Sequence, residues 1–277
     1  MQDKVVQMMT TTIFDQIIAG VIEDVAAREA VVPFQEIKAR SRDMPAPRDA
    51  MASLLMPGCS IIAELKRSAP DIGHIADIDE PTILATAYET GGAHMIACHT
   101  ERRRFAGSLE EMAQVSAATT VPIMCRDFIV DPYQIHEARC FGADVIPLRV
   151  AALEQPRLEA LIDRVESLGM TALVEVRNVA EAYRAMAARA QVIGINARDF
   201  STMTLNKEVF GEIAPGLPSE TIKVALSGVR TARELIEYAS SGADAVVIGE
   251  QLVRAQSPRE FTAALVAAGQ HPSCPRR

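Results

Sequence analysis

Eight short apolar runs, each of strand length, recur along the chain and alternate with segments of helical composition. They are Ile61–Leu65, Met95–Cys98, Val121–Cys125, Val145–Leu148, Ala172–Val176, Val192–Ile195, Ile222–Leu226 and Ala245–Ile248. Apolar strands that alternate with helices indicate a parallel sheet with covered faces. Eight such units within about 210 residues predict an α/β fold, the (β/α)8 TIM barrel, with a doubly wound open sheet as the alternative.

Glycine-alanine steps precede several of these runs. They are Gly91-Gly92-Ala93, Gly142-Ala143-Asp144 and Gly242-Ala243-Asp244. A glycine directly after a helix is typical of a position with a positive φ angle, which other residues adopt at a steric cost. The steps therefore support the predicted alternation of helix and strand.

The first fifty residues have a different pattern. Apolar side chains recur at helical spacing from about residue 11 to 30, which predicts an amphipathic helix. Pro33, Pro45 and Pro47 then indicate a connecting region ahead of the first strand. We expect three parts: an N-terminal helical extension packed on the barrel (residues 1–50), the barrel (51–268) and a disordered tail (269–277).

The charge balance argues against a nucleic-acid partner. The chain has 28 Lys and Arg residues against 36 Asp and Glu residues, a net charge of -8, and Arg102-Arg103-Arg104 is its one basic run. Binding along a phosphate backbone needs a concentrated basic surface. No run reaches the roughly 18 apolar residues of a membrane span, and no leader-like apolar segment follows Met1. We expect no nucleic-acid or membrane partner, and a monomer or weak homo-oligomer.

The five cysteines show neither a CxxC pair nor the spacing of a zinc site, and their number is odd. Disulfide frameworks are typical of oxidising compartments. We therefore predict that these cysteines are small buried side chains and that the protein is cytoplasmic. We also expect neither a metal nor an organic cofactor. The cysteines are Cys59, Cys98, Cys125, Cys140 and Cys274.

Polar residues follow each of the eight runs, at the end where such a barrel places its active site. In the first run, strand alternation directs Glu64 and Lys66 to the same side. A charged pair there is costly inside a core unless it is hydrogen-bonded or used. The other strand ends carry His99, Thr100, Glu101, Arg126, Asp127, Arg149, Glu175, Arg177, Asn196, Arg198, Ser227 and Glu250. Polar residues gathered around one rim predict an active site.

Two strand ends carry a glycine directly after the apolar run. Leu226-Ser227-Gly228-Val229 ends the seventh run and Val247-Ile248-Gly249-Glu250 ends the eighth. Without a Cβ, backbone N–H groups approach an anion closely, and loops seven and eight of such barrels frequently hold phosphate. The sequence therefore predicts a phosphorylated small-molecule substrate, bound by Ser227, Gly228, Gly249 and Glu250.

Seven ordered motifs run through the chain. They are Ala63-Glu64-Leu65-Lys66 with Pro70, Phe105–Glu110, Asp127–Ile135, Leu173–Val176, Ile193–Asp199, Ser227–Val229 and Ile248–Glu250. In this order the chain resembles the indole-3-glycerol phosphate synthase family of tryptophan biosynthesis, from the N-terminal helix to about residue 268. The resemblance implies a carboxy-lyase that closes the pyrrole ring of an anthranilate-bearing aminodeoxyribulose 5-phosphate, with loss of carbon dioxide and water.

The resemblance also implies roles for individual residues. Lys66 is similar to the lysine that protonates the sugar carbonyl or hydroxyl, Glu64 orients it, and Glu175 is similar to the glutamate that exchanges a proton in the dehydration. Asn196 is implied as an orienting hydrogen-bond partner, and Arg198 as a contact to phosphate or to carboxylate. Ring closure and dehydration need an acid and a base on opposite faces of one carbonyl. The wall beside the aromatic ring is implied for Pro70, Phe105 and Phe128.

Several positions depart from the family's pattern. Arg126 stands where a second catalytic lysine is expected, and a guanidinium stabilises charge but is a poor proton donor. Leu226 replaces a glutamate. The remaining departures are Ala69 and Asp71 for two serines around Pro70, His99 for a leucine, and Pro147 and Arg149 within an aliphatic stretch of the pocket wall.

These departures leave two interpretations open. One is neutral drift with compensation or an offset in the match, and the other is a diverged paralogue whose aryl half is rebuilt for a more polar or anionic group. Three functions follow: synthase activity with electrostatic help from Arg126, a related lyase or cyclase acting on a more polar phosphorylated aminodeoxyketose, and a non-catalytic phosphosugar-binding barrel. The presence of Glu64, Lys66, Glu175 and Asn196 argues against the third.

Overall fold

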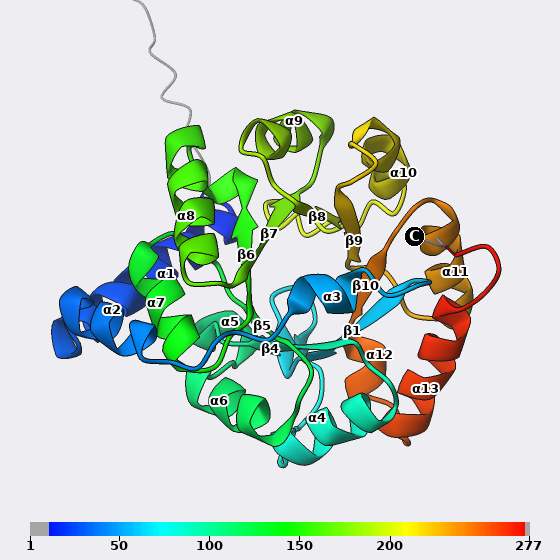
Figure 1. Ribbon diagram of the computed structural model, residues 1–277, viewed down its shortest axis with the longest axis horizontal. Helices are drawn as coiled ribbons and strands as arrows, with labels where there is room; N and C mark the ends of the chain where they lie inside the picture. Colours follow the sequence, from blue (N-terminus) through cyan, green and yellow to red (C-terminus); the bar gives the residue numbers. More distant parts are fainter. Residues whose placement is uncertain (1–10, 275–277) are drawn as a thin grey trace, which may run out of the picture.

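Eight parallel strands close into a barrel in the computed structural model, which describes residues 11–274 (Figure 1). Around the barrel the strand order is β1, β10, β9, β8, β7, β6, β5 and β4. The predicted (β/α)8 barrel is confirmed, and the open sheet is excluded because the strand pairs form a closed ring in which β1 joins β4 to β10. The barrel strands are β1 (Ser60–Leu65), β4 (Met95–His99), β5 (Ile123–Arg126), β6 (Val145–Arg149), β7 (Thr171–Val176), β8 (Val192–Asn196), β9 (Ile222–Leu226) and β10 (Ala245–Ile248).

Helices follow the strands and form the outer layer of the barrel (Figure 1). They are α4 (Pro81–Thr90), α5 (Arg102–Phe105), α6 (Leu109–Ala118), α7 (Pro132–Cys140), α8 (Gln155–Ser167), α9 (Val179–Ala187), α10 (Val209–Ile213), α11 (Ala232–Ser240), α12 (Glu250–Val253) and α13 (Pro258–Gly269), with 3-10 turns η1 (Val150–Ala152) and η2 (Ala214–Gly216).

Local sequence encodes both ends of many of these helices. Side-chain oxygens of Asp131 and Thr231 accept backbone N–H groups in the first turns of α7 and α11. At the other ends, the predicted glycines Gly92, Gly142 and Gly242 have φ angles of 93°, 87° and 98°. These backbone conformations are ones that other residues rarely adopt, so the glycines set where the next strands begin.

Alternate strand side chains fill the interior of the barrel. A short helix, α3 (Ala50–Leu54), adds Ala50 and Leu54 to this interior cluster. A filled interior leaves the carboxyl-terminal rim as the place for a site. The strand residues of the interior cluster are Ile62, Met95, Ala97, Met124, Val145, Leu173, Val192, Ile222, Val224, Leu226, Ala245 and Val247.

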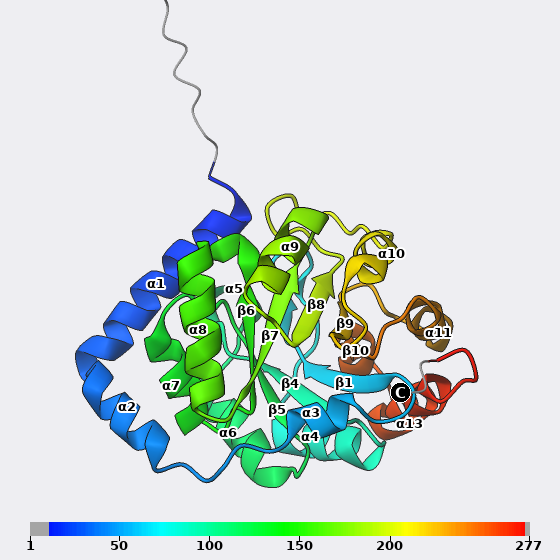
Figure 2. The same cartoon turned by 45° about the horizontal axis from the view of Figure 1, so that its top comes forward.

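Two N-terminal helices, α1 (Ile13–Val31) and α2 (Phe34–Arg42), lie outside the barrel, and α2 packs along α7 (Figure 2). The sequence predicted α1, but the prediction of a connecting region after Pro33 is wrong for α2. A proline that ends one helix is also well tolerated at the start of the next, and Ile37 gives α2 an apolar side that is buried.

The expected division into extension, barrel and tail stays a prediction. Residues 1–10 and 275–277 lie outside the described residues. Ahead of the latter, α13 ends at Gly269 and Cys274 is buried. None of the helices within residues 11–274 is both long enough and apolar enough to cross a membrane.

A small hairpin follows β1 and brings part of the β1–α4 loop to the rim. It consists of β2 (Ser68–Ala69) and β3 (Gly73–His74), which pair antiparallel. Pro70 and Asp71 lie at its tip, and both line the pocket described next. The hairpin therefore determines which side chains close the mouth of the barrel on this side.

Candidate active site

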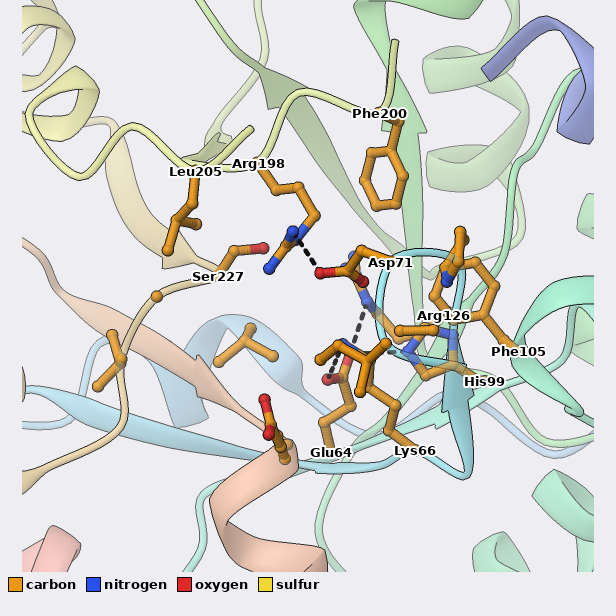
Figure 3. Close-up of a pocket in the computed structure, with 18 of the residues that line it drawn as sticks. Glu64, Lys66, Asp71, His99, Phe105, Arg126, Arg198, Phe200, Leu205 and Ser227 are labelled. Atoms are coloured by element: carbon orange, nitrogen blue, oxygen red, sulfur yellow. Dashed lines mark hydrogen bonds and ion pairs between the residues drawn. The ribbon is translucent and has the colours of Figure 1, made fainter. Parts of the chain in front are cut away.

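A pocket opens at the carboxyl-terminal rim of the barrel, and most of the predicted site residues line it (Figure 3). Side chains from the ends of β1, β4 and β5 form one side, and the loops after β8, β9 and β10 form the other. The lining residues are Glu64, Lys66, Ala69, Pro70, Asp71, Ile72, His99, Phe105, Arg126, Arg198, Phe200, Leu205, Ser227, Gly228, Val229, Arg230, Val247, Gly249 and Glu250.

A second, smaller cavity adjoins this pocket, and Phe200 lines both. Glu175 and Asn196, both predicted to be catalytic, line the second cavity together with Arg149. Lys66 lines only the first. The structure therefore divides the predicted catalytic side chains between two spaces that meet at Phe200.

Two residues predicted for the pocket wall line neither space. Phe128 is buried behind Phe105, with 6.0 Å between the ring centroids. Pro147 pairs in register with Leu173, whose side chain lies in the barrel interior, and it follows interior residue Val145 by two positions. Strand alternation thus places Pro147 on the interior face of β6, below the rim.

Glu64 lies at the centre of a buried network of charges. Its carboxylate accepts a hydrogen bond from His99 Nε2 at 2.9 Å and from Arg126 Nε at 3.3 Å, and Lys66 Nζ lies 3.8 Å away. Burial raises the pKa of Glu64, but Lys66, His99 and Arg126 outweigh it and hold that pKa well below its ordinary value. Gly249 leaves room for this carboxylate, because a Cβ there would collide with Glu64 Oε2.

Arg126 connects this network to Glu175. Its Nη1 donates a hydrogen bond to Glu175, whose other carboxylate oxygen accepts from Asn196 Nδ2 at 3.3 Å and lies 3.5 Å from Arg149 Nη2. Burial raises the pKa of Glu175, but Arg149 and Arg126 outweigh it, so that the pKa lies below its ordinary value. One guanidinium therefore bridges two buried carboxylates, and both carboxylates are charged at neutral pH.

A chain of hydrogen bonds continues from Asn196 to the loops after β8 and β9. Asn196 Oδ1 accepts from Ser227 Oγ at 2.9 Å and from the backbone N–H of Arg198 at 3.0 Å. Ser227 and Gly228 both have positive φ angles, 68° and 86°, which turn the chain sharply after β9. Asn196 thereby fixes the orientation of two loops that line the pocket.

The predicted anion contact, Arg198, is paired within the protein. Its Nη1 lies 2.6 Å from Asp71 Oδ2 and donates a hydrogen bond to Met203 O at 3.1 Å. Figure 3 shows Arg198 and Asp71 pointing toward each other over the pocket. At the opposite loop, the Glu250 carboxylate pairs with Arg254 Nη1 at 3.1 Å.

His99 adds an uncharged polar group to the pocket. Its ring stacks on Phe105 with 4.4 Å between centroids and an interplanar angle of 5°. Burial lowers the pKa of His99 to about 4, although Glu64 acts in the opposite direction. The imidazole is therefore neutral at pH 7, and its Nε2–H is directed at Glu64.

Sequence reasoning missed two lining residues in the loop after β8, Phe200 and Leu205. The loop folds back so that Arg198 and Leu205 form an isolated antiparallel bridge. One signal was present, because Phe200 is an apolar aromatic residue directly after Asp199 in a loop that already supplies Asn196 and Arg198. Among the described residues, no group of His, Cys, Asp and Glu side chains could hold a metal ion.

Comparisons with solved structures agree on the fold. A 3-hexulose-6-phosphate synthase from Salmonella typhimurium superposes with a TM-score of 0.62 at 12% identity, over 76% of this chain and 100% of that chain. A thiamine phosphate pyrophosphorylase from Pyrococcus furiosus gives a TM-score of 0.59 at 13% identity, over 79% and 97%. At this level of identity the likeness concerns the barrel alone.

Comparisons of sequence identify the family as well as the fold. The family model described as indole-3-glycerol phosphate synthase matches residues 14–265. The indole-3-glycerol phosphate synthase of Mycolicibacterium gilvum is 54% identical over 269 residues, covering 97% of this chain and 99% of the relative. That of Saccharopolyspora erythraea is 56% identical over 265 residues, covering 96% and 98%. The resemblance inferred from the motifs is confirmed, and the chain belongs to the indole-3-glycerol phosphate synthase family.

Proposed function

We propose that the protein is a carboxy-lyase that closes the pyrrole ring of an arylamino-deoxyribulose 5-phosphate, with loss of carbon dioxide and water. Membership of the family and relatives of that name over nearly the full length support this activity. The observation that carries the proposal is one pocket that combines a lysine, Lys66, with glycine loops and an arginine suited to an anion. The alternative of a different, more polar substrate gains no support from the relatives' names.

Lys66 is the proposed acid that protonates the sugar oxygen. Its side chain is 22% exposed, and its ammonium group has Glu64 at 3.8 Å, which is an ion-pair distance without a hydrogen bond. Donors therefore remain for a substrate oxygen. Glu64 is the proposed positioning residue, because its own hydrogen bonds to His99 and Arg126 fix its carboxylate beside the lysine.

Glu175 is the proposed proton acceptor, with Asn196 orienting it. Arg126 acts electrostatically, because it stays protonated while it bridges Glu64 and Glu175. For Lys66 and Glu175 to act on one substrate, the two cavities that meet at Phe200 must become one. We propose that Phe200 moves aside when the aromatic half of the substrate binds.

The phosphate group is proposed to lie at the loops after β9 and β10. The glycine of each loop, Gly228 or Gly249, exposes backbone without a Cβ, and both line the pocket. Ser227 and Glu250 flank them, and Arg198 supplies positive charge once it leaves Asp71. We also propose a cytoplasmic protein, which five cysteines that are all unpaired thiols support, and a monomer or weak homo-oligomer.

The test is a steady-state assay of the purified protein with the anthranilate-derived ribulose phosphate, followed by the fluorescence of the indole product. Turnover of about 1 s⁻¹ or more would support synthase activity at the level of an ordinary biosynthetic enzyme. No turnover, with phosphate still bound, would contradict the proposal and favour a different phosphorylated aminodeoxyketose. A matched assay with a ribulose phosphate that lacks the aryl group controls for indirect fluorescence changes.

A further inference from the structure

Arg149, at the end of β6, packs against two aromatic rings beside the proposed substrate pocket. Its guanidinium carbon lies 4.0 Å from the centroid of the Phe128 ring and 4.7 Å from that of Phe200. The side chain is only 7% exposed. The two ring centroids are only 5.6 Å apart and the ring planes are nearly perpendicular, so the rings flank the guanidinium from two adjacent sides and not from opposite faces. A ligand can therefore reach the guanidinium only from the sides that the rings leave uncovered.

The N–H groups of Arg149 are poorly paired within the protein. The buried Nε of Arg149 has no hydrogen-bond partner, and its Nη2 approaches Glu175 only to 3.5 Å. Buried donors are nearly always hydrogen-bonded, because an unpaired one keeps its full desolvation cost. Glu175 has two hydrogen-bond donors besides Arg149, namely Arg126 and Asn196, although the charge of Arg149 also helps to lower its pKa.

The direct ionic contacts around Arg149 carry a surplus of positive charge. Two carboxylates, Glu64 and Glu175, face three cations, Lys66, Arg126 and Arg149. Asp127 also attracts Arg149, but among the described residues it makes no ion pair with it, and its carboxylate instead accepts from Thr100 Oγ1 at 2.6 Å and from the Phe128 N–H at 2.7 Å. A buried cation in such a place is stabilised when an anion arrives.

We propose that Arg149 is a specificity-determining residue, and that it binds a carboxylate carried by the aromatic half of the substrate. A carboxylate matches the edge of a guanidinium, which offers two parallel N–H donors, here Nε and Nη2. The substrate ring reaches this edge through the second cavity, which Arg149 and Phe200 both line, and takes the place that Phe200 holds against the guanidinium. The inference rests on the proposed function for the identity of the substrate's two halves.

The experiment compares two unreactive ligands. Both carry the phosphate and have the sugar ketone reduced to an alcohol, and they differ only in whether the aryl ring bears a carboxylate or a hydrogen. Dissociation constants are measured by calorimetry for the wild type and for Arg149→Leu. We expect Arg149→Leu to weaken the carboxylate ligand by about 10- to 100-fold and the other ligand by less than about 3-fold.

Arg149→Leu should fold, because Glu175 keeps Arg126 and Asn196 as partners, and its thermal unfolding is recorded alongside binding. If it does not fold, Arg149→Lys replaces it, since a lysine keeps the charge but loses the paired donors and should still reduce the preference for the carboxylate ligand. Arg157→Leu, on the exposed side of α8, is the matched control and should leave both dissociation constants unchanged.

Equal weakening of both ligands by Arg149→Leu would overturn the proposal, as would a wild type that binds the two ligands equally. The outcome is separate from that of the proposed function, because it depends on binding and not on turnover. A wild type that prefers the carboxylate ligand through Arg149 but forms no indole would contradict the proposed reaction and leave the role of Arg149 standing.

Discussion

Asp71 and Arg198 form an ion pair over the mouth of the pocket, with 2.6 Å between Asp71 Oδ2 and Arg198 Nη1 (Figure 3). The two side chains come from the β2–β3 hairpin and from the loop after β8. Because Arg198 is the proposed anion contact, a substrate phosphate must compete with the carboxylate of Asp71. The position of the β2–β3 hairpin, which carries Asp71, should therefore affect how tightly the anion binds.

Asp71→Asn should tighten phosphate binding by about 3- to 10-fold, because it removes a competing charge while it keeps the size of the side chain. The measurement is calorimetric titration with ribose 5-phosphate at low ionic strength. Asp77→Asn is the matched control, since Asp77 belongs to the same loop but its side chain is 84% exposed. Weaker binding by Asp71→Asn would mean that Asp71 holds Arg198 in its binding position instead of blocking it.

Lys66→Met should reduce turnover by about 10²- to 10⁴-fold, the loss expected when a proton-transfer group is removed. The measurement is kcat with the anthranilate-derived substrate, with phosphate affinity recorded to show that the pocket survives. Lys223→Met serves as the control, because Lys223 Nζ contacts carbonyl groups of Pro218 and Thr221 near the start of β9. A Lys66→Met enzyme with near-normal kcat would remove Lys66 from the mechanism.

Because of His99, we expect the free energy of unfolding to decrease in mild acid. Its pKa is about 4 in the folded protein, below its ordinary value of 6.5, because burial disfavours the charged imidazole. Between these values the unfolded chain binds the additional proton, so the free energy of unfolding falls as pH falls, by up to about 1.4 kcal/mol per pH unit for this one group.

Chemical denaturation of the wild type and of His99→Leu between pH 7 and pH 5 tests this expectation. The variant should lose less stability on acidification, and the difference in slope isolates His99 from other groups. His74→Gln, on the exposed hairpin, is the control and should follow the wild type. Parallel slopes for wild type and His99→Leu would contradict the assignment of a lowered pKa.

The strand-end residues were predictable because strand alternation and barrel topology do not depend on side-chain detail. Glu64 and Lys66 lie two positions apart on β1, and the sequence correctly brings them together with Arg126 and the glycine loops. Pro147 follows the same alternation but lies one layer too deep to reach the pocket. Strand alternation predicts on which face of the strand a side chain lies. It does not predict how far along the strand the barrel interior ends and the rim begins.

The partners of individual charges were harder to predict. Asp71 was recognised as a departure, but its ion pair with Arg198 spans two loops whose course depends on the hairpin and on the bridge between Arg198 and Leu205. The position of Phe200 between two cavities likewise depends on that loop. Such contacts arise from tertiary packing over long sequence separations, which local patterns do not encode.

Arg126→Lys tests whether the guanidinium limits the reaction. A guanidinium donates its proton poorly, whereas a lysine at the end of β5 would bring a titratable amine to the same place. We expect Arg126→Lys to raise indole formation by at least about 10-fold, which is less than the roughly 10²- to 10⁴-fold of a well-placed proton donor because Lys66 already supplies one acid. The measurement is kcat over pH 6 to pH 10. The kcat of the variant should fall at alkaline pH as the amine deprotonates, and that of the wild type should not show this fall.

Arg126→Met is the control, because it removes the cation without adding an acid and should lower kcat. If Arg126→Lys were slower than the wild type at every pH, the bridge that Arg126 makes between Glu64 and Glu175 would matter more than an acid at this position, since one ammonium group on a shorter side chain cannot span both carboxylates.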